Sequence, residues 1–321
     1  MLTFPRPPEQ TELMDAYRRA RDQTSGLTVP IVSYNIRLDA QESDPNNHFT
    51  RRVHRLGAFV REVEPWIVGL QEPFSGQLLH LESLLPDQFA VVGDIANDHG
   101  NLDRADPRRH ADFQTAILYD SSRLQLIEQD HVWLSRSPRT QGSKDWDSMG
   151  ARTVTVAGFH VLGHGAPLAH PEQGLPVHFV VLNTHLDVRS ARARQEQARL
   201  VRSHVLAWQR KHPRATIFVT GDMNSANGQY SHQILTQPPV SDHDTVVVEA
   251  SEIVQGSNVR VSSTAASLQD AWDYCATMSD SCEIQPFAAS FHGWLGPAAN
   301  NYGVRLLTYM LLAIHESGVV L

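Results

Sequence analysis

The stretch from Thr216 to Asn224, TIFVTGDMN, indicates the fold of this chain. A run of β-type residues leads into Gly221, and Asp222 and Asn224 then stand two positions apart. Side chains at positions i and i+2 of an extended chain point the same way, so these two can converge at the carboxyl end of a strand. A carboxylate and a carboxamide placed there can hold a hard cation, a phosphate oxygen or an attacking water. The simpler alternative is a strand that ends in an ordinary Asp/Asn turn.

Three further expected strands end in polar residues. Asn35 closes the first, Glu72 closes the second, and His185 and Asp187 follow the third. Each residue alone is more often a cap or a turn residue, but four successive buried strands with such ends are hard to assign to chance. Carboxylate and amide oxygens suit Mg²⁺ or Mn²⁺, and His185 could donate to an oxyanion or a phosphoryl oxygen.

The rest of the chain favours one α/β domain of layered sheets over residues 29–321, because many strands alternate with few helices. Residues 1–28 are expected to form a leader. Strands are expected at 29–36, 66–72, 89–92, 115–119, 124–128, 132–134, 154–162, 177–183 and 216–220. Helices are expected at 51–64, 78–85, 191–211 and 303–314, and a hairpin or loop at 256–267.

The composition restricts the partners and the compartment. The 321 residues carry 27 Lys and Arg against 35 Asp and Glu, a net charge of −8, which argues against a protein that coats nucleic acid. Two cysteines, Cys275 and Cys282, are too few for a disulfide framework. The sequence has no apolar signal segment and no apolar run long enough to span a bilayer. A cytoplasmic protein with no membrane partner and no obligate protein partner is therefore expected.

The polar strand ends, taken in order, resemble the endonuclease/exonuclease/phosphatase superfamily. The motifs that carry the resemblance are Tyr34-Asn35-Ile36-Arg37, Gln71-Glu72, Asn183-Thr184-His185-Leu186-Asp187 and Gly221-Asp222-Met223-Asn224. Within the superfamily the chain is similar to the metal-dependent hydrolases of bacteria and fungi. That similarity lies at 133–135, 142–147 with Arg152 after it, 268–272 and 290–293. The resemblance covers roughly Pro30 to Gly296.

The resemblance implies a DNase I-like, four-layered α/β sandwich, in which two packed mixed β-sheets are flanked by helices. It also implies a cofactor, Mg²⁺ or Mn²⁺, with Glu72 as the principal metal ligand and Asn35 in support. Asp222 would orient the nucleophilic water, and Asn224 would hold that water or a scissile phosphate oxygen. His185 would stabilise the pentacovalent transition state.

Three further residues are implied as substrate contacts: Asp187, Arg152 and His292. The chain departs from the family after His292, because it lacks the Arg-Ile-Asp-Tyr-type strand and the final Ser-Asp-His motif. The triplet Ser241-Asp242-His243 comes before residues 268–272, in the wrong order, and reads as a coincidence. The domain is therefore expected to be incomplete at its C-terminus, with central strands missing and their neighbours unpaired.

These observations predict a Mg²⁺-dependent phosphoesterase that uses metal-assisted in-line attack of water. The expected substrate is a small phosphoester. Nucleic acid is less favoured because the chain is acidic and lacks a basic stripe interleaved with aromatic residues. The alternative is a non-catalytic or truncated family member that keeps a metal or ligand cleft but lacks the terminal Asp-His pair. An unrelated α/β binding domain is a third possibility, in which the polar strand ends would not cluster.

Overall fold

A computed structural model describes residues 29–39, 43, 45–93, 115–163, 175–225 and 228–237, and the backbone of 268–270 and 308–313. Its strands are β1 (Ile31–Asn35), β2 (Ile67–Gln71), β3 (Phe89–Val92), β4 (Thr115–Asp120), β5 (Leu124–Trp133), β6 (Thr153–Val161), β7 (Phe179–His185), β8 (Thr216–Asp222), β9 (Leu268–Asp270) and β10 (Thr308–Ala313). Its helices are η1 (Pro45–Asn47, a 3₁₀ turn), α2 (Phe49–Val63), α3 (Ser75–Glu82), α4 (Ala191–Lys211) and α5 (Tyr230–Thr236).

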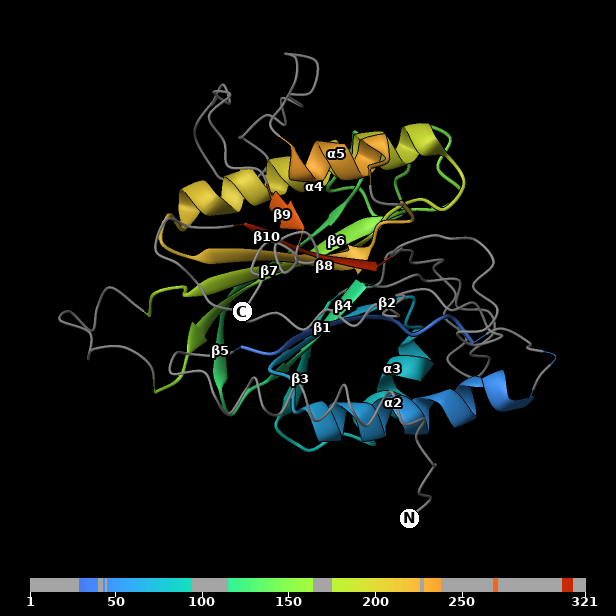
Figure 1. Ribbon diagram of the computed structural model, residues 1–321, viewed down its shortest axis with the longest axis vertical. Coiled ribbons are helices and arrows are strands. Elements are labelled where there is room, and N and C mark those ends of the chain that lie inside the picture. The colour runs from blue at the N-terminus through green and yellow to red at the C-terminus, as the bar shows by residue number, and fades with distance from the viewer. Residues whose placement is uncertain are drawn as a thin grey trace.

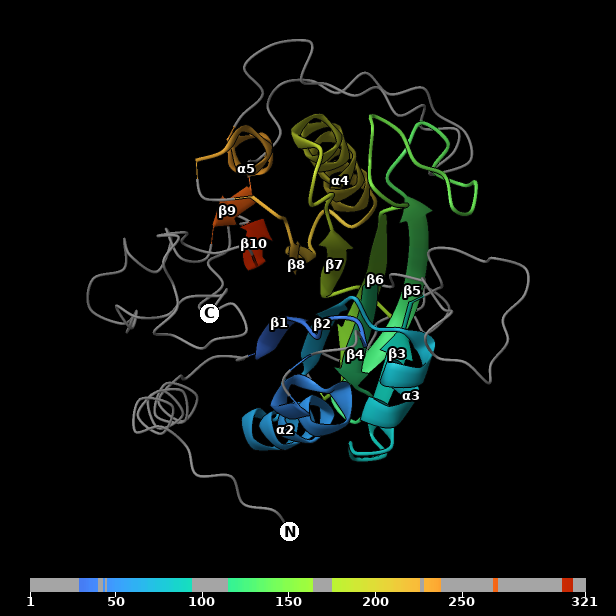
Figure 2. The ribbon, with the colours of Figure 1, turned by 90° about the vertical axis from the view of Figure 1, so that its right-hand side faces the viewer.

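Two mixed sheets form the centre of the molecule. Sheet A has the strand order β1-β2-β4-β3, and sheet B has the order β5-β6-β7-β8-β10-β9. In sheet A, β1 and β2 are parallel, and in sheet B, β7 and β8 are parallel, while the other pairs are antiparallel. Helices α2 and α3 cover the outer face of sheet A, and α4 and α5 cover sheet B (Figure 1). Figure 2 shows the same order of layers from the side, so the predicted four-layered sandwich is confirmed.

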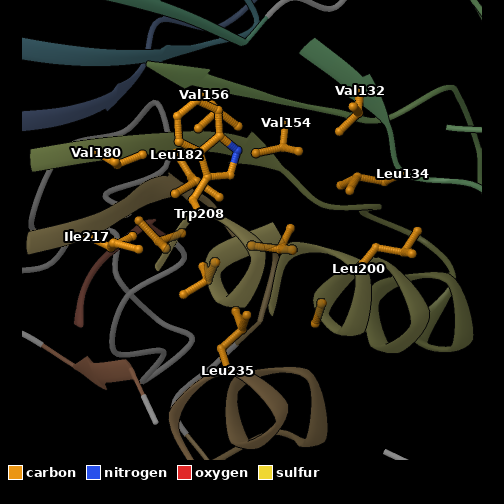
Figure 3. Close-up of a cluster of buried hydrophobic side chains, with 14 of the residues drawn as sticks. Val132, Leu134, Val154, Val156, Val180, Leu182, Leu200, Trp208, Ile217 and Leu235 are labelled. Atoms are coloured by element: carbon orange, nitrogen blue, oxygen red, sulfur yellow. The ribbon is translucent and has the colours of Figure 1, made fainter. Parts of the chain in front are cut away.

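Helix α4 covers sheet B with an apolar stripe. It begins after Ser190, whose Oγ accepts a hydrogen bond from the Ala193 amide, as an N-cap does. Figure 3 shows Trp208 from this helix lying among aliphatic side chains of the sheet, including Leu182 and Ile217. Burying one such aliphatic side chain contributes roughly 1.5–3 kcal/mol. This packing fixes the carboxyl ends of β7 and β8 relative to the start of α4.

Two expectations about strands are wrong. Residues 303–314 were expected to be helical, but Thr308–Ala313 form β10, because a short apolar run fits a buried strand as well as a helix and pairing with β8 decides between them. Strand β10 pairs with β8 on the side away from β7. Residues 124–128 and 132–134 were expected as two strands, but Leu124–Trp133 form one strand with a bulge between Leu126 and Glu128.

Burial of His204 on α4 makes the stability of the fold depend on pH. This burial lowers the pKa of His204 to about 4, and the charge of Arg139 lowers it further while that of Asp130 opposes the change. The unfolded chain takes up a proton near pH 6.5 and the folded chain does not, so stability is lost as pH falls from about 6.5 towards 4. Between pH 7 and pH 5 this residue should cost about 2 kcal/mol of the free energy of unfolding.

Urea unfolding of the wild type and of His204→Gln at both pH values measures this contribution. The variant should lose about 2 kcal/mol less than the wild type over that range. An equal loss in the two proteins would show that His204 is not kept neutral by burial.

Candidate active site

The polar residues predicted at four strand ends come together at one edge of the sandwich. Asn35 ends β1 and Glu72 follows β2, while His185 ends β7 and Asp222 ends β8. Parallel neighbours end at the same edge of a sheet, so each sheet brings two polar residues to that edge. The prediction that these residues cluster is confirmed by hydrogen bonds that join Asn35, Glu72 and Asp222, and by the 3.9 Å separation of His185 Nε2 from Asp222 Oδ2.

Asn35 joins the two sheets at this edge. Its Nδ2 donates to Glu72 Oε1 at 2.9 Å and to Asp222 Oδ2 at 2.9 Å, so one amide nitrogen holds a carboxylate from each sheet. Asn35 Oδ1 accepts from the Arg37 amide at 2.8 Å, and Glu72 Oε2 accepts from the Leu38 amide at 3.0 Å. Both polar atoms of the Asn35 side chain and both carboxylate oxygens of Glu72 therefore have a hydrogen-bond partner, which fixes the orientation of the two side chains.

The backbone at this edge adopts left-handed conformations that residues other than glycine rarely take. Arg37 has φ 55°, Glu72 has φ 64° and Asn224 has φ 47°. A left-handed conformation of this kind costs on the order of 1–3 kcal/mol and persists only where the surroundings hold it in place. Three such residues within one hydrogen-bonded group indicate a functional site.

Asn224 orients His185. Its Nδ2 donates to the carbonyl of Leu186 at 2.9 Å, which identifies this atom as the nitrogen of the amide. The second hydrogen of Nδ2 is then directed to His185 Nε2 at 2.9 Å, so Nε2 accepts and the neutral ring carries its proton on Nδ1. The backbone N–H of Asn224 donates to Asp222 Oδ1 at 3.0 Å, and His185 Nε2 lies 3.9 Å from Asp222 Oδ2.

Burial changes the proton affinities of these groups in opposite directions. Burial lowers the pKa of His185 well below its usual 6.5, and the charge of Arg152 adds to the effect. Burial raises the pKa of Asp222, and the neighbouring charge of Glu72 adds to this, although hydrogen bonds from Asn35 and Asn224 oppose it. The site therefore combines a neutral imidazole with a carboxylate of increased basicity.

Arg152 and Asp187 form a buried pair beside this group. Arg152 Nε lies 4.0 Å from Asp187 Oδ2, and the side chains are 4% and 0% exposed. The charge of Arg152 also interacts with those of Glu72 and Asp222.

Asp187 accepts hydrogen bonds at 2.7–2.9 Å from Ser148 Oγ and from the amides of Met149, Arg189 and Ser190. Burial alone would raise the pKa of Asp187, but these hydrogen bonds together lower it. Asp187 thus ties the 148–149 loop to the start of α4.

Solved structures with this arrangement of layers have one fold in common. An endonuclease/exonuclease/phosphatase from Bacteroides vulgatus superposes with a TM-score of 0.61 at 17% identity, covering 89% of this chain and 87% of that one. The catalytic domain of human Nocturnin, solved with bound sulfate, gives 0.53 at 14% identity, covering 89% and 83%. A mannosyl-6-phosphatase of Bacteroides thetaiotaomicron gives 0.53 at 23% identity, covering 64% and 69%. The chain has the endonuclease/exonuclease/phosphatase fold.

This finding confirms the DNase I-like fold predicted from the ordered motifs. The similarity is one of structure, because no family model and no curated protein sequence matches the chain. The narrower resemblance to the hydrolases of bacteria and fungi, and the absence of the terminal motifs, stay predictions.

The donor atoms at the site fit a hard divalent cation. Glu72, Asp222 and Asn35 present only oxygen atoms apart from the bridging Nδ2, and the two carboxylates lie close enough to share that nitrogen. Each of the four carboxylate oxygens of Glu72 and Asp222 accepts one hydrogen bond from Asn35, Leu38 or Asn224 and has a second lone pair. Within the described ranges no three His, Cys, Asp or Glu side chains form a metal-binding group. A Mg²⁺ ion binds such sites through one or two carboxylates and retains several waters.

The other predicted residues have different positions. Arg152 lies beside the group, and Asp187 contacts Arg152 from a fully buried position. His292 and the Ser241-Asp242-His243 triplet lie outside the described residues.

Two buried polar residues beneath the site, Gln71 and Asn183, were not predicted to have a role of their own. Gln71 Nε2 donates to Asn183 Oδ1 at 2.7 Å, and Asn183 Nδ2 donates to the carbonyls of Leu70 and Ala116. These hydrogen bonds link sheet A to sheet B directly below the site. An uncharged polar residue inside an otherwise apolar strand is the signal that could have identified them.

Gly221 allows the close approach of β7 and β8 next to the site. A Cβ at this position would lie 2.4 Å from the carbonyl oxygen of Thr184, which is its partner on β7. We therefore expect Gly221→Ala to separate the strands that carry His185 and Asp222, and to lower the free energy of unfolding by about 1–3 kcal/mol. Gly150→Ala is the matched control, because a Cβ there meets no atom within 4 Å. Denaturant unfolding of both variants tests this, and equal stabilities would contradict it.

Proposed function

We propose that the protein is a phosphoesterase that depends on a divalent metal ion. The observation that supports this most strongly is the convergence of Asn35, Glu72 and Asp222, from both sheets, into one hydrogen-bonded group, to which Asn224 joins His185. The neighbours with this fold include proteins named as a phosphatase and as an endonuclease/exonuclease/phosphatase. Hydrolysis of a phosphoester is the chemistry that oxygen ligands, a basic carboxylate and a neutral imidazole serve together.

Glu72 would hold Mg²⁺ or Mn²⁺, with Asn35 fixing its orientation. A bound ion supplies neutralisation of the charge that develops on the phosphoryl oxygens. Asp222 orients a water molecule for in-line attack and accepts its proton. Asn224 holds His185 in place.

His185 and Arg152 supply the remaining polar contacts with the reacting group. The neutral His185 ring donates one hydrogen bond to a phosphoryl oxygen, and its lowered pKa keeps it neutral near pH 7. Arg152 adds positive charge beside the same group from its buried position. We propose Arg152 and Asp187 as a pair in which Asp187 positions Arg152, and His292 as a further substrate contact.

The proposed substrate is a small phosphoester. The net charge of −8 disfavours long nucleic acid as a partner. No helix in the described part of the chain is long and apolar enough to cross a membrane. Arg189, Arg192 and Arg194 form a basic cluster near the start of α4, close in sequence to Asp187, and could meet a phosphate beside the site.

Hydrolysis of two chromogenic substrates tests the proposal. The purified protein is assayed with bis-p-nitrophenyl phosphate, a diester, and with p-nitrophenyl phosphate, a monoester, in Mg²⁺, in Mn²⁺ and in EDTA. We expect hydrolysis of at least one substrate with either metal and none in EDTA. Hydrolysis that persists in EDTA would exclude the metal-dependent mechanism. Binding of Mn²⁺ without turnover of either substrate would favour the non-catalytic alternative.

A further inference from the structure

The loop after β1 contacts the candidate active site on one side and two helices on the other. On the site side, the Arg37 amide donates to Asn35 Oδ1 and the Leu38 amide donates to Glu72 Oε2. On the opposite side, the carbonyls of this loop accept hydrogen bonds from Arg52 on α2 and from Gln77 on α3. These helices lie side by side beneath sheet A (Figures 1 and 2).

Arg52 makes most of the contacts on the helix side. Its guanidinium donates to the carbonyls of Ile36, Arg37 and Leu38, the last two at 3.4 Å, and its Nε donates to the carbonyl of Asn47 at 2.7 Å. The planar fork of an arginine can reach several carbonyls at once, and a lysine cannot reproduce this geometry. Gln77 Nε2 donates to the Arg37 carbonyl at 2.9 Å.

The contacts on the two sides of the loop share the same peptide groups. The peptide that joins Ile36 to Arg37 receives Arg52 at its carbonyl and donates from its N–H to Asn35. The next peptide, from Arg37 to Leu38, receives Arg52 and Gln77 at its carbonyl and donates from its N–H to Glu72. A donor on the carbonyl polarises a peptide and strengthens the hydrogen bond that its N–H makes.

The backbone of Arg37 needs such support, because its φ of 55° is unfavourable for a residue with a side chain. Arg52 and Gln77 both reach its carbonyl, so two helices stabilise the conformation that directs the Leu38 amide towards Glu72.

We propose that Arg52 is a positioning residue for the active site, which acts through two peptide groups to orient Asn35 and Glu72. The part of this proposal that concerns catalysis rests on the proposed function, since Glu72 and Asn35 are taken to hold the metal ion. The orientation itself does not rest on it and can be measured separately.

The test compares the wild type with Arg52→Met, Arg52→Lys and the control Arg55→Met. Arg52→Met keeps an aliphatic stem but removes the donors, together with the guanidinium whose Cζ lies 5.6 Å from the centre of the Phe49 ring. Arg52→Lys keeps the charge and loses the fork, and serves as the folded comparison if Arg52→Met does not fold. Arg55 is exposed on the same helix, so Arg55→Met removes an equal charge while the hydrogen bonds from Arg52 to the carbonyls of residues 36–38 are kept.

The first readout is hydrogen exchange of the Arg37 and Leu38 amides, measured by NMR without metal or substrate. We expect exchange to become about tenfold faster in Arg52→Met, because the two peptide groups lose the donors that hold their carbonyls, and their N–H groups then open more often. Arg52→Lys should show an intermediate increase, and Arg55→Met should show none. Unchanged exchange in folded Arg52→Met, or in Arg52→Lys if only that variant folds, would overturn the proposal whatever the protein catalyses.

The second readout is the binding of Mn²⁺, followed by electron paramagnetic resonance, together with kcat and KM. In Arg52→Met we expect half-saturating Mn²⁺ to rise about tenfold and kcat to fall about 10–100-fold, with KM little changed. Faster exchange with unchanged Mn²⁺ binding would overturn the link between Arg52 and the metal. A wild type that binds Mn²⁺ but hydrolyses nothing would count against the proposed function and leave the exchange and binding comparisons intact.

Discussion

Replacing Glu72 by Gln is expected to lower kcat by about 10³-fold, because it removes the carboxylate that holds the metal ion and with it several kcal/mol of transition-state stabilisation. Half-saturating Mn²⁺ should rise in the same variant. The Gln side chain also places its NH₂ group against either Asn35 Nδ2 or the backbone N–H of Leu38. In the wild type both of these groups donate hydrogen bonds to Glu72. Initial rates measured across a range of Mn²⁺ concentrations give both quantities.

The control for this change is Glu196→Gln on α4. Glu196 forms an i,i+3 ion pair with Arg199 and has a partly exposed carboxylate, so its loss should leave activity unchanged. Thermal unfolding of both variants separates an effect on the site from an effect on the fold. Glu72→Gln that keeps wild-type kcat and wild-type metal dependence would show that Glu72 is not the metal ligand.

Asp222→Asn is expected to lower kcat by about 10²–10⁴-fold, because an amide cannot accept the proton of the attacking water. KM should change little, and half-saturating Mn²⁺ should change far less than in Glu72→Gln. Steady-state kinetics at saturating Mn²⁺ measures these values. Asp130→Asn serves as the control, since Asp130 lies on β5 and pairs with Arg139, away from the strand ends that form the site.

The two variants separate the roles of the two carboxylates that share Asn35. A dominant effect on metal binding in Asp222→Asn, with kcat preserved at saturating Mn²⁺, would exchange the assignments. Equal losses of both kinds in both variants would indicate that the carboxylates bind the ion together.

The sequence predicted the elements whose periodicity and ends are both well marked. Helix α4 was predicted at 191–211 and spans those residues, because its apolar stripe is long and Ser190 caps it. Strand β10 was predicted as a helix, because the pairing partner that decides its conformation lies more than 80 residues earlier in the chain. Strand β5 was split in two because its central residues are polar and half-buried, and their pairing with β6 is not visible in the sequence.

The candidate site was predictable where side chains carry the chemistry. Asn35, Glu72, His185 and Asp222 stand out as polar ends of apolar strands, and the structure brings them together. The contribution of Arg52 could not be predicted, since it acts on backbone carbonyls and its spacing from the site residues has no motif. The structural role of Asp187 also depends on backbone amides from two separate loops.

The amide bridge made by Asn35 affects when, during folding, the protein becomes able to bind a ligand at the candidate site. It connects Asn35 to Glu72, which lies 37 positions later in the chain, and to Asp222, which lies 187 positions later. Neither sheet therefore contains the candidate site by itself. Contacts this distant in sequence carry a large loop-closure cost and tend to be completed late in folding. Any ligand that binds only when the two halves are docked must add its binding free energy to their association. The same ligand therefore stabilises the association of the two sheets, and the free energy of this association rises with the ligand concentration.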